Sequence, residues 1–182
     1  MRVISGNLRG TKLYTLEGLD TRPTLDRVKE SLFNIINFDV KDSMFLDLFA
    51  GSGAIGIEAA SRGAKKVIMC EKSKEAVNII NKNLQKTRLQ DDIELYNMDF
   101  ENCIQNKLKD KFDIIYLDPP YKTDYAYKAT KLLIEKELVK KDTIIILETD
   151  IEQIVENQFE NLSLTEINKK KYGRASLLFY KA

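Results

Sequence analysis

The chain has 182 residues, 43% of them hydrophobic and 31% charged, and a formal net charge of +1. This balance is typical of one globular domain and excludes a disordered chain, and no apolar run approaches the roughly 18 residues needed to span a bilayer. The absence of histidine excludes Ser-His-Asp and Cys-His nucleophile pairs, imidazole general bases and almost every zinc site that needs a histidine ligand.

The N-terminal segment, residues 1–43, is predicted to be an extension packed on the rest of the chain. Two short runs, 2–4 and 11–15, are separated by glycines and have the pattern of a small β-hairpin. A helix is predicted from about residue 25 to 38, with Thr24 as its N-cap and one apolar stripe facing the core.

From residue 44 onward, strands and helices alternate. The predicted strands are residues 44–48, 66–70, 93–97, 112–117, 143–147, 163–168 and 175–180. The predicted helices are one that ends near residue 62, then 74–88, 101–108, 125–137 and 151–158. Such alternation predicts an α/β fold with βαβ units, a mostly parallel sheet and right-handed crossovers. The last two strands have no room for a helix between them, so we expect the sheet to end in an antiparallel hairpin.

A glycine-rich loop follows the first strand of this series. Gly51, Gly53 and Gly56 match the pattern G-x-G-x-x-G, and Glu71 lies 20 residues after Gly51 at the tip of the next strand. In a dinucleotide site such glycines let the backbone approach the ligand, and the acid binds a ribose hydroxyl. A nicotinamide-binding domain is therefore one interpretation, and a glycine turn without a ligand is another.

Three features favour S-adenosylmethionine over a nicotinamide cofactor. Asp47 precedes the glycines at the strand end, where a carboxylate suits a cationic amino group and would repel a pyrophosphate. The chain has no length left for the separate substrate domain that dehydrogenases usually need. The fourth strand ends in residues 118–121, Asp-Pro-Pro-Tyr, for which hydride transfer has no obvious use.

The Asp-Pro-Pro-Tyr segment has the chemistry of a site for a flat, amine-bearing ring. Asp118 can accept hydrogen bonds from an amino group, and Tyr121 can stack on a ring. Pro119 and Pro120 stiffen the turn, since proline fixes φ and lacks a backbone donor. A nucleobase fits this description. The alternative is a strand that ends in a proline turn with a tyrosine covering the core.

These motifs together resemble the class I S-adenosylmethionine-dependent methyltransferases, and more narrowly the RsmD-type 16S rRNA guanine methyltransferases. The resemblance rests on residues 2–6 with 9–10, on 22–24 with 26–30 and 33–34, on 47–56, on 118–121 and on 172–174. It covers nearly the whole chain. It implies a single Rossmann-like methyltransferase domain, 1–182, with a seven-stranded sheet, an RNA-facing extension at 1–43 and a cofactor-binding catalytic core at 44–182.

The resemblance also implies roles for individual residues. The methionine part of S-adenosylmethionine would be held by Asp47 and by the loop formed by Phe49, Ala50, Gly51, Ser52 and Gly53. Glu71 would bind the ribose hydroxyls and Asp99 the adenine amino group, although Asp99 can equally be a helix N-cap.

On the substrate side, Asp118 and the carbonyl of Pro119 would accept the hydrogens of a guanine N2 amine, with Tyr121 stacked on the flipped base. The resemblance implies that the RNA is contacted by Arg9, Arg22, Thr24 and Arg27. No metal is required.

The expected partner is 16S rRNA within the small ribosomal subunit or an assembly intermediate, and we expect a cytoplasmic monomer with no membrane association. Cys70 and Cys103 lack metal-type spacing and are predicted to be reduced and packed. Two alternatives stay open: a DNA adenine-N6 methyltransferase, which shares the Asp-Pro-Pro-Tyr segment, and a noncatalytic RNA-binding assembly factor on the same fold.

Overall fold

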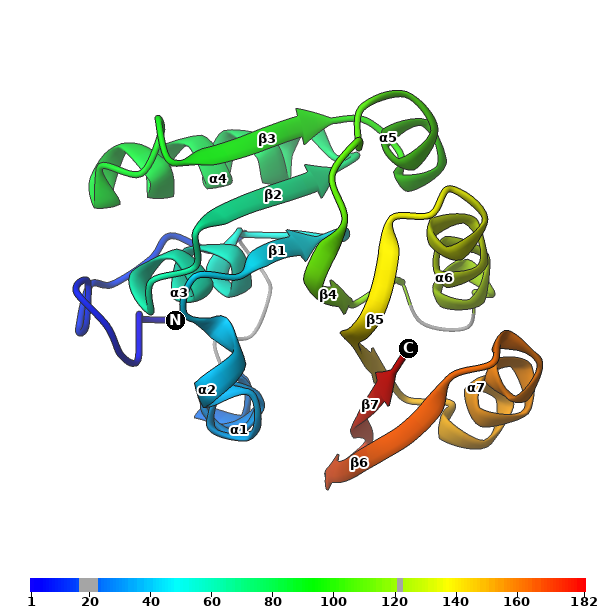
Figure 1. Ribbon diagram of the computed structural model, residues 1–182. Coiled ribbons are helices and arrows are strands. Elements are labelled where there is room, and N and C mark those ends of the chain that lie inside the picture. Colours follow the sequence, from blue (N-terminus) through cyan, green and yellow to red (C-terminus); the bar gives the residue numbers. More distant parts are fainter. Residues whose placement is uncertain (17–22, 121–122) are drawn as a thin grey trace.

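The computed structural model describes residues 1–16, 23–120 and 123–182 (Figure 1). Arg22 and Tyr121, which the sequence analysis assigns to the site, lie outside the described residues. The helices are α1 Pro23–Ile35, α2 Asn37–Val40, α3 Ala54–Ser61, α4 Lys74–Thr87, α5 Phe100–Asn106, α6 Tyr125–Glu135 and α7 Glu152–Phe159. The strands are β1 Met44–Asp47, β2 Lys66–Glu71, β3 Ile93–Asn97, β4 Phe112–Leu117, β5 Val139–Thr149, β6 Thr165–Tyr172 and β7 Ala175–Lys181. Within this described part, no helix has the length and apolar character to cross a bilayer.

The described strands form one seven-stranded sheet in the order β3-β2-β1-β4-β5-β7-β6. Neighbouring strands from β3 to β5 are parallel, whereas β7 pairs antiparallel with both β5 and β6. The predicted mostly parallel sheet with an antiparallel C-terminal hairpin is therefore confirmed. The strand order reverses between β1 and β4, and ligands of such sheets bind in the crevice beyond the carboxyl ends of the strands at this point.

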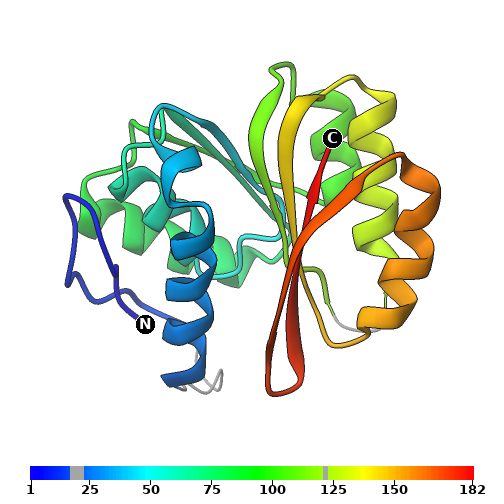
Figure 2. The same ribbon diagram turned by 60° about the horizontal axis from the view of Figure 1, so that its bottom comes forward.

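Helices cover both faces of the sheet, and side-chain alternation along each strand decides which helices they meet. One face carries Phe45 and Ile114, which pack in one buried cluster with residues of α1 to α4 such as Leu32. The opposite face carries Leu46 and Ile115, which pack with residues of α5, α6 and α7. Figure 2 shows the blue-to-teal helices on one side of the sheet and the green-to-orange helices on the other. Both faces of the central strands are thus buried.

The N-terminal extension differs from the prediction. The expected hairpin is reduced to a single antiparallel bridge between Arg2 and Lys12. The helix begins at Pro23 rather than after Thr24, because proline suits a first helical turn in which no backbone donor is needed. Thr24 therefore lies inside the helix and is not its N-cap. The single helix predicted to reach residue 38 is interrupted at Ile36, whose φ of −95° and ψ of 15° are not helical.

Three consecutive lysines near the C-terminus lie in an edge strand. The last hairpin begins at Thr165, later than predicted, so Lys169, Lys170 and Lys171 belong to β6. Lys169 forms ion pairs of 2.8 Å with both Glu152 and Glu156 of α7. Lysines are common on edge strands because they oppose pairing with another chain.

Candidate active site

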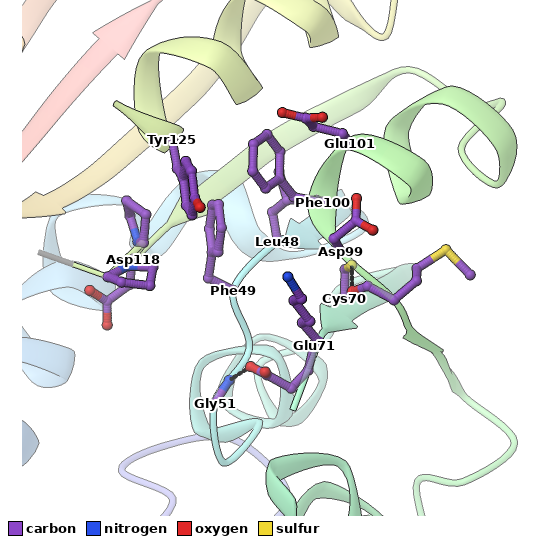
Figure 3. Close-up of a pocket in the computed structure, with 14 residues that line it drawn as sticks. Leu48, Phe49, Gly51, Cys70, Glu71, Asp99, Phe100, Glu101, Asp118 and Tyr125 are labelled. Atoms are coloured by element: carbon purple, nitrogen blue, oxygen red, sulfur yellow. Dashed lines mark hydrogen bonds between the residues drawn. The ribbon is translucent and has the colours of Figure 1, made fainter. Parts of the chain in front are cut away.

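A cavity of about 620 Å³ opens at the carboxyl ends of β1, β2, β3 and β4 (Figure 3). Its wall is formed by Leu48, Phe49, Gly51, Cys70, Glu71, Lys72, Met98, Asp99, Phe100, Glu101, Asp118, Pro119, Pro120 and Tyr125. Most of the residues that the sequence assigns to cofactor or catalysis therefore lie around one space. Ala50, Ser52 and Gly53 belong to the loop beside it, and Asp47 is buried beneath it.

The glycine loop is held in shape by local conformation and by α4. Gly51 and Gly53 have φ of +55° and +77°, a region that side chains rarely adopt. The buried side chain of Asn83 donates to the Ser52 carbonyl at 2.9 Å and to the Tyr14 carbonyl at 3.0 Å. The same amide therefore connects the loop to the N-terminal extension. The sequence analysis did not identify this role of Asn83.

Asp47 carries an unsatisfied buried acceptor. Only 1% of the residue is exposed. Its Oδ2 accepts a hydrogen bond from the Gly56 amide at 3.2 Å, and its Oδ1 has no partner among the described residues. Burial raises the pKa of Asp47 to about 7, the Gly56 amide opposes this shift, and Glu71 adds to it. A buried carboxylate with a spare lone pair suits a cationic amino group, so the site fits the methionine end of S-adenosylmethionine.

Glu71 is fixed by two backbone amides at the tip of β2. Its Oε2 accepts from Gly51 at 2.8 Å, shown by a dashed line in Figure 3, and its Oε1 accepts from Ser73 at 2.7 Å. Each oxygen keeps a second lone pair, so the carboxylate can still accept two hydroxyl donors. This arrangement suits the ribose contact that remains a prediction for Glu71.

Asp99 is the N-cap of α5, as the alternative interpretation expected. Its Oδ1 accepts from the Asn102 amide at 2.9 Å and its Oδ2 accepts from the Asn102 side chain at 2.7 Å. The hydrogen bond from the Asn102 backbone is the main cause of the lowered pKa of Asp99. The residue also lines the cavity. The adenine contact is compatible with this geometry and remains a prediction.

A row of aromatic rings crosses the cavity wall. The ring centroids of Phe49 and Phe100 are 5.4 Å apart, and those of Phe100 and Tyr125 are 5.2 Å apart. The sequence analysis missed Phe100 and Tyr125 as site residues. A usable signal was that Phe100 begins the helix after β3 and Tyr125 begins the helix after β4, so both come after carboxyl ends of parallel strands.

Asp118 lies at the other end of the cavity from Asp99, with Phe49 between them in Figure 3. It directly follows β4, and its side chain is accessible. Crowding by protein atoms, then Glu148, then Asp47 raise the pKa of the Asp118 carboxyl. Because Asp118 remains open to solvent, we attribute the rise of its pKa to the two nearby acids as much as to burial. Pro119 is buried and Pro120 is exposed, and both line the cavity.

The basic residues assigned to RNA contact lie elsewhere. Arg9 and Arg27 line a second cavity of about 420 Å³ in the N-terminal extension, together with Arg2. All three are exposed. Thr24 lies in the first turn of α1, and Arg22 is outside the described residues. The structure thus brings Arg9 and Arg27 together, away from the wall of the cavity beside Asp118.

The chain matches the protein family described as "Conserved hypothetical protein 95" over residues 1–181. It belongs to this family. A Bacillus subtilis relative named "Putative rRNA methyltransferase YlbH" is 37% identical, covering 100% of this chain and 98% of the relative. Haemophilus influenzae "Ribosomal RNA small subunit methyltransferase D" is 41% identical over 82% of this chain and 79% of the relative.

The fold is also similar to that of a solved methyltransferase structure. "Putative methyltransferase yhhF from Escherichia coli" superposes with a TM-score of 0.86 at 29% identity, covering 100% of this chain and 97% of that chain. The resemblance to the RsmD-type methyltransferases and the class I methyltransferase fold are therefore confirmed.

Proposed function

We propose that this chain transfers a methyl group from S-adenosylmethionine to the exocyclic N2 amine of a guanine in 16S rRNA of the small ribosomal subunit. The names of its relatives support rRNA as the substrate. The observation that carries the chemistry is the placement of Asp47 and Asp118 at the ends of adjacent parallel strands. β1 and β4 pair with Asp47 opposite Tyr116, so the two acids lie on either side of the point where the strand order reverses.

The residues around the cavity would hold the cofactor by its two ends. Asp47 supplies a buried carboxylate for the amino group, and Glu71 presents fixed acceptors to the ribose hydroxyls. Asp99, Phe100 and Met98 form the wall where the adenine ring would lie. When bound, S-adenosylmethionine supplies an electrophilic methyl group on a sulfonium.

The acceptor amine needs help because its lone pair is delocalised into the purine ring. Asp118 and the Pro119 carbonyl would accept its two hydrogens and turn the lone pair toward the cofactor side of the cavity. The prolines restrict this segment, so the acceptors are positioned before the base arrives. Asp118 then takes a proton once the amine has become cationic, and Tyr121 would stack on the base.

The arginine-rich extension would hold the RNA backbone. Arg9 and Arg27, with Arg22 and Thr24, are proposed to contact phosphates and so fix where the target base enters. In this proposal residues 1–43 face the RNA and residues 44–182 bind the cofactor and catalyse transfer, within a cytoplasmic monomer.

The proposal is tested by methyl transfer to rRNA. Small subunits from cells lacking this protein, incubated with it and tritiated S-adenosylmethionine, should gain label in one guanosine as N2-methylguanosine. Label in DNA adenine instead would favour the second enzyme class and reject the proposal.

Asp118→Ala separates catalysis from a noncatalytic RNA-binding role. We expect turnover to fall at least about a hundredfold, because an acceptor for the reacting amine is lost. Binding of S-adenosylhomocysteine, measured by isothermal titration, should persist. Unchanged methylation by this variant would contradict the mechanism.

A further inference from the structure

Glu148 of β5 is a buried acid that the proposed reaction does not use. The residue is 8% exposed. Its Oε2 accepts a hydrogen bond from the Tyr116 hydroxyl at 2.7 Å. Its Oε1 has no hydrogen-bond partner within residues 1–16, 23–120 and 123–182. This oxygen is not among the fully enclosed side-chain atoms that lack a partner in the described part of the chain, so a donor can reach it from outside. Glu148 can therefore accept one further hydrogen bond from a ligand.

Strand register places this acid beside Asp118. In the β4–β5 pairing Tyr116 lies opposite Ile146, and Leu117 lies opposite Leu147. Side chains alternate along a strand, so the residues that follow, Asp118 and Glu148, continue the row of Tyr116 and Ile146. That row faces the side of the sheet covered by α1 to α4, whereas Leu117 and Leu147 face α5 to α7. Asp118 and Glu148 are thus neighbours on the side of the N-terminal extension.

The electrostatics of the two acids agrees with this placement. In addition to crowding by protein atoms, Glu148 is one of the two nearby acids that raise the pKa of the Asp118 carboxyl. Burial also raises the pKa of Glu148 itself, and the hydrogen bond from Tyr116 opposes that shift. The neighbouring carboxyl groups of Asp118 and Glu148 therefore suit a ligand with two adjacent hydrogen-bond donors.

The Watson–Crick edge of guanine presents such donors, because its N1–H lies next to its N2 amino group. Adenine differs at this position, since its N1 is an acceptor. We propose that Glu148 is a specificity-determining residue that accepts the N1–H of the target guanine beside Asp118. This inference rests on the proposed function and names the contact that selects guanine.

The same contact excludes adenine. A carboxylate facing the lone pair of an adenine N1 leaves two acceptors opposed in a poorly solvated place, which disfavours that base. Tyr116 is a positioning residue, because its hydroxyl occupies one oxygen of Glu148 and leaves the other for the base. In this proposal a residue of β5, Glu148, selects guanine over adenine, whereas Asp118 after β4 acts on the reacting amine.

The test uses 2-aminopurine, which keeps the N2 amine but has an acceptor at N1. Small-subunit RNA is assembled by splinted ligation with guanine or 2-aminopurine at the methylated position and reconstituted into particles. We expect the wild type to prefer guanine. In Glu148→Gln the side-chain amide can rotate and donate to the 2-aminopurine N1. We therefore expect the preference for guanine over 2-aminopurine, as the ratio of the two kcat/KM values, to fall by at least about tenfold.

The ratio of kcat/KM for guanine to kcat/KM for 2-aminopurine, compared between the wild type and the variant, distinguishes base selection from a structural role of Glu148. A variant that merely disturbs the fold lowers both rates equally and leaves the preference unchanged. 2-Aminopurine also lacks O6, but that difference is common to both enzymes and cancels. Glu135→Gln, an exposed change on α6, is the matched control and should keep the wild-type preference.

The outcomes are distinct from those of the proposed function. A wild type that labels no guanosine rejects the function itself. A wild type that methylates guanine but accepts 2-aminopurine equally well overturns the inference without any variant. An unchanged preference in a folded Glu148→Gln enzyme overturns it as well.

Discussion

At the scale of single residues, the chemistry of this site depends on how burial changes carboxylates. Asp47 is enclosed and has one unpaired oxygen, which holds its pKa at about 7. Asp99 carries two hydrogen bonds from Asn102, and its pKa is lowered. The surroundings thus raise the pKa of Asp47 and lower that of Asp99. A cation that binds next to Asp47 would stabilise its charged form.

Binding of S-adenosylhomocysteine should depend on the protonation of Asp47. The ligand's ammonium group needs the carboxylate, and with a pKa of about 7 the free protein increasingly holds the proton as the pH falls below that value. We expect affinity to weaken up to about tenfold per pH unit below neutrality. Asp47→Asn should bind weakly with little of this dependence in isothermal titration, while the exposed Asp91→Asn should retain it. A flat profile for the wild type would contradict the assignment.

The same burial should make Asp47 destabilising in the free protein. Its folded-state pKa is raised from 3.8 to about 7, so the unfolded chain releases the proton first and stability falls as pH rises between these values. Asp47→Asn removes this penalty. We expect it to be more stable than the wild type near pH ~8, on the order of 1–4 kcal/mol, and to lose that advantage near pH ~4, by urea denaturation. A destabilised variant at the higher pH would refute this.

At the scale of elements, the decisive contact joins the N-terminal extension to α3. The fully buried Glu58 accepts from the amides of Ile4 and Ser5 at 2.8 and 2.9 Å. It also pairs with Lys29 of α1 at 3.1 Å and with Arg62 at 2.8 Å. A buried carboxylate is tolerated here because donors surround it. This junction fixes the arginine-lined cavity relative to the catalytic core.

Gly6 and Gly10 provide a matched test of that junction. Both have positive φ, +82° and +86°, but a Cβ on Gly6 would lie 1.8 Å from the Ser61 carbonyl oxygen, whereas a Cβ on Gly10 would meet nothing within 4 Å. Gly10→Ala should cost about 1–2 kcal/mol from backbone strain alone. Gly6→Ala should cost clearly more, because backbone must move, and should expose the extension to proteolysis. Equal losses in urea denaturation would show that the clash is relieved cheaply.

At the scale of the whole molecule, the total charge is nearly zero but the positive residues are unevenly placed. The formal net charge is only +1, yet Arg2, Arg9 and Arg27 gather at one cavity. Under the proposed function, RNA would be steered by this local arginine cluster and not by the total charge. Salt dependence of binding measures how many phosphates the cluster contacts.

Arg9→Ala and Arg27→Ala should each weaken RNA binding and reduce the slope of log affinity against log salt by about one. S-adenosylhomocysteine binding should be unchanged, because neither residue lines the first cavity. Lys131→Ala on α6 removes a positive charge from the other side of the sheet and is the control. An unaltered slope in both arginine variants would place the RNA contact elsewhere.

Local patterns predicted most of the fold. The apolar runs of β1 to β5 and the lack of room for a helix before β7 were sufficient for a mostly parallel sheet with a terminal hairpin, since strand burial and linker length are local properties. The predicted helix 74–88 is confirmed as α4, with Ser73 as its N-cap. The hairpin expected within the N-terminal extension was wrong, because the backbone of Ile4 and Ser5 bonds to Glu58, more than 50 residues away in sequence.

The sequence by itself determined the alternation of strands and helices, the glycine loop and the proline turn after β4, because each depends on neighbours along the chain. Only the tertiary structure decided that the Phe100 and Tyr125 rings meet at one cavity, that Asp47 keeps an unpaired oxygen and that Glu148 lies beside Asp118. Those relations arise from strand order and register, which bring the ends of distant segments together. No local pattern encodes them, because burial and pairing are fixed only when the whole sheet is assembled.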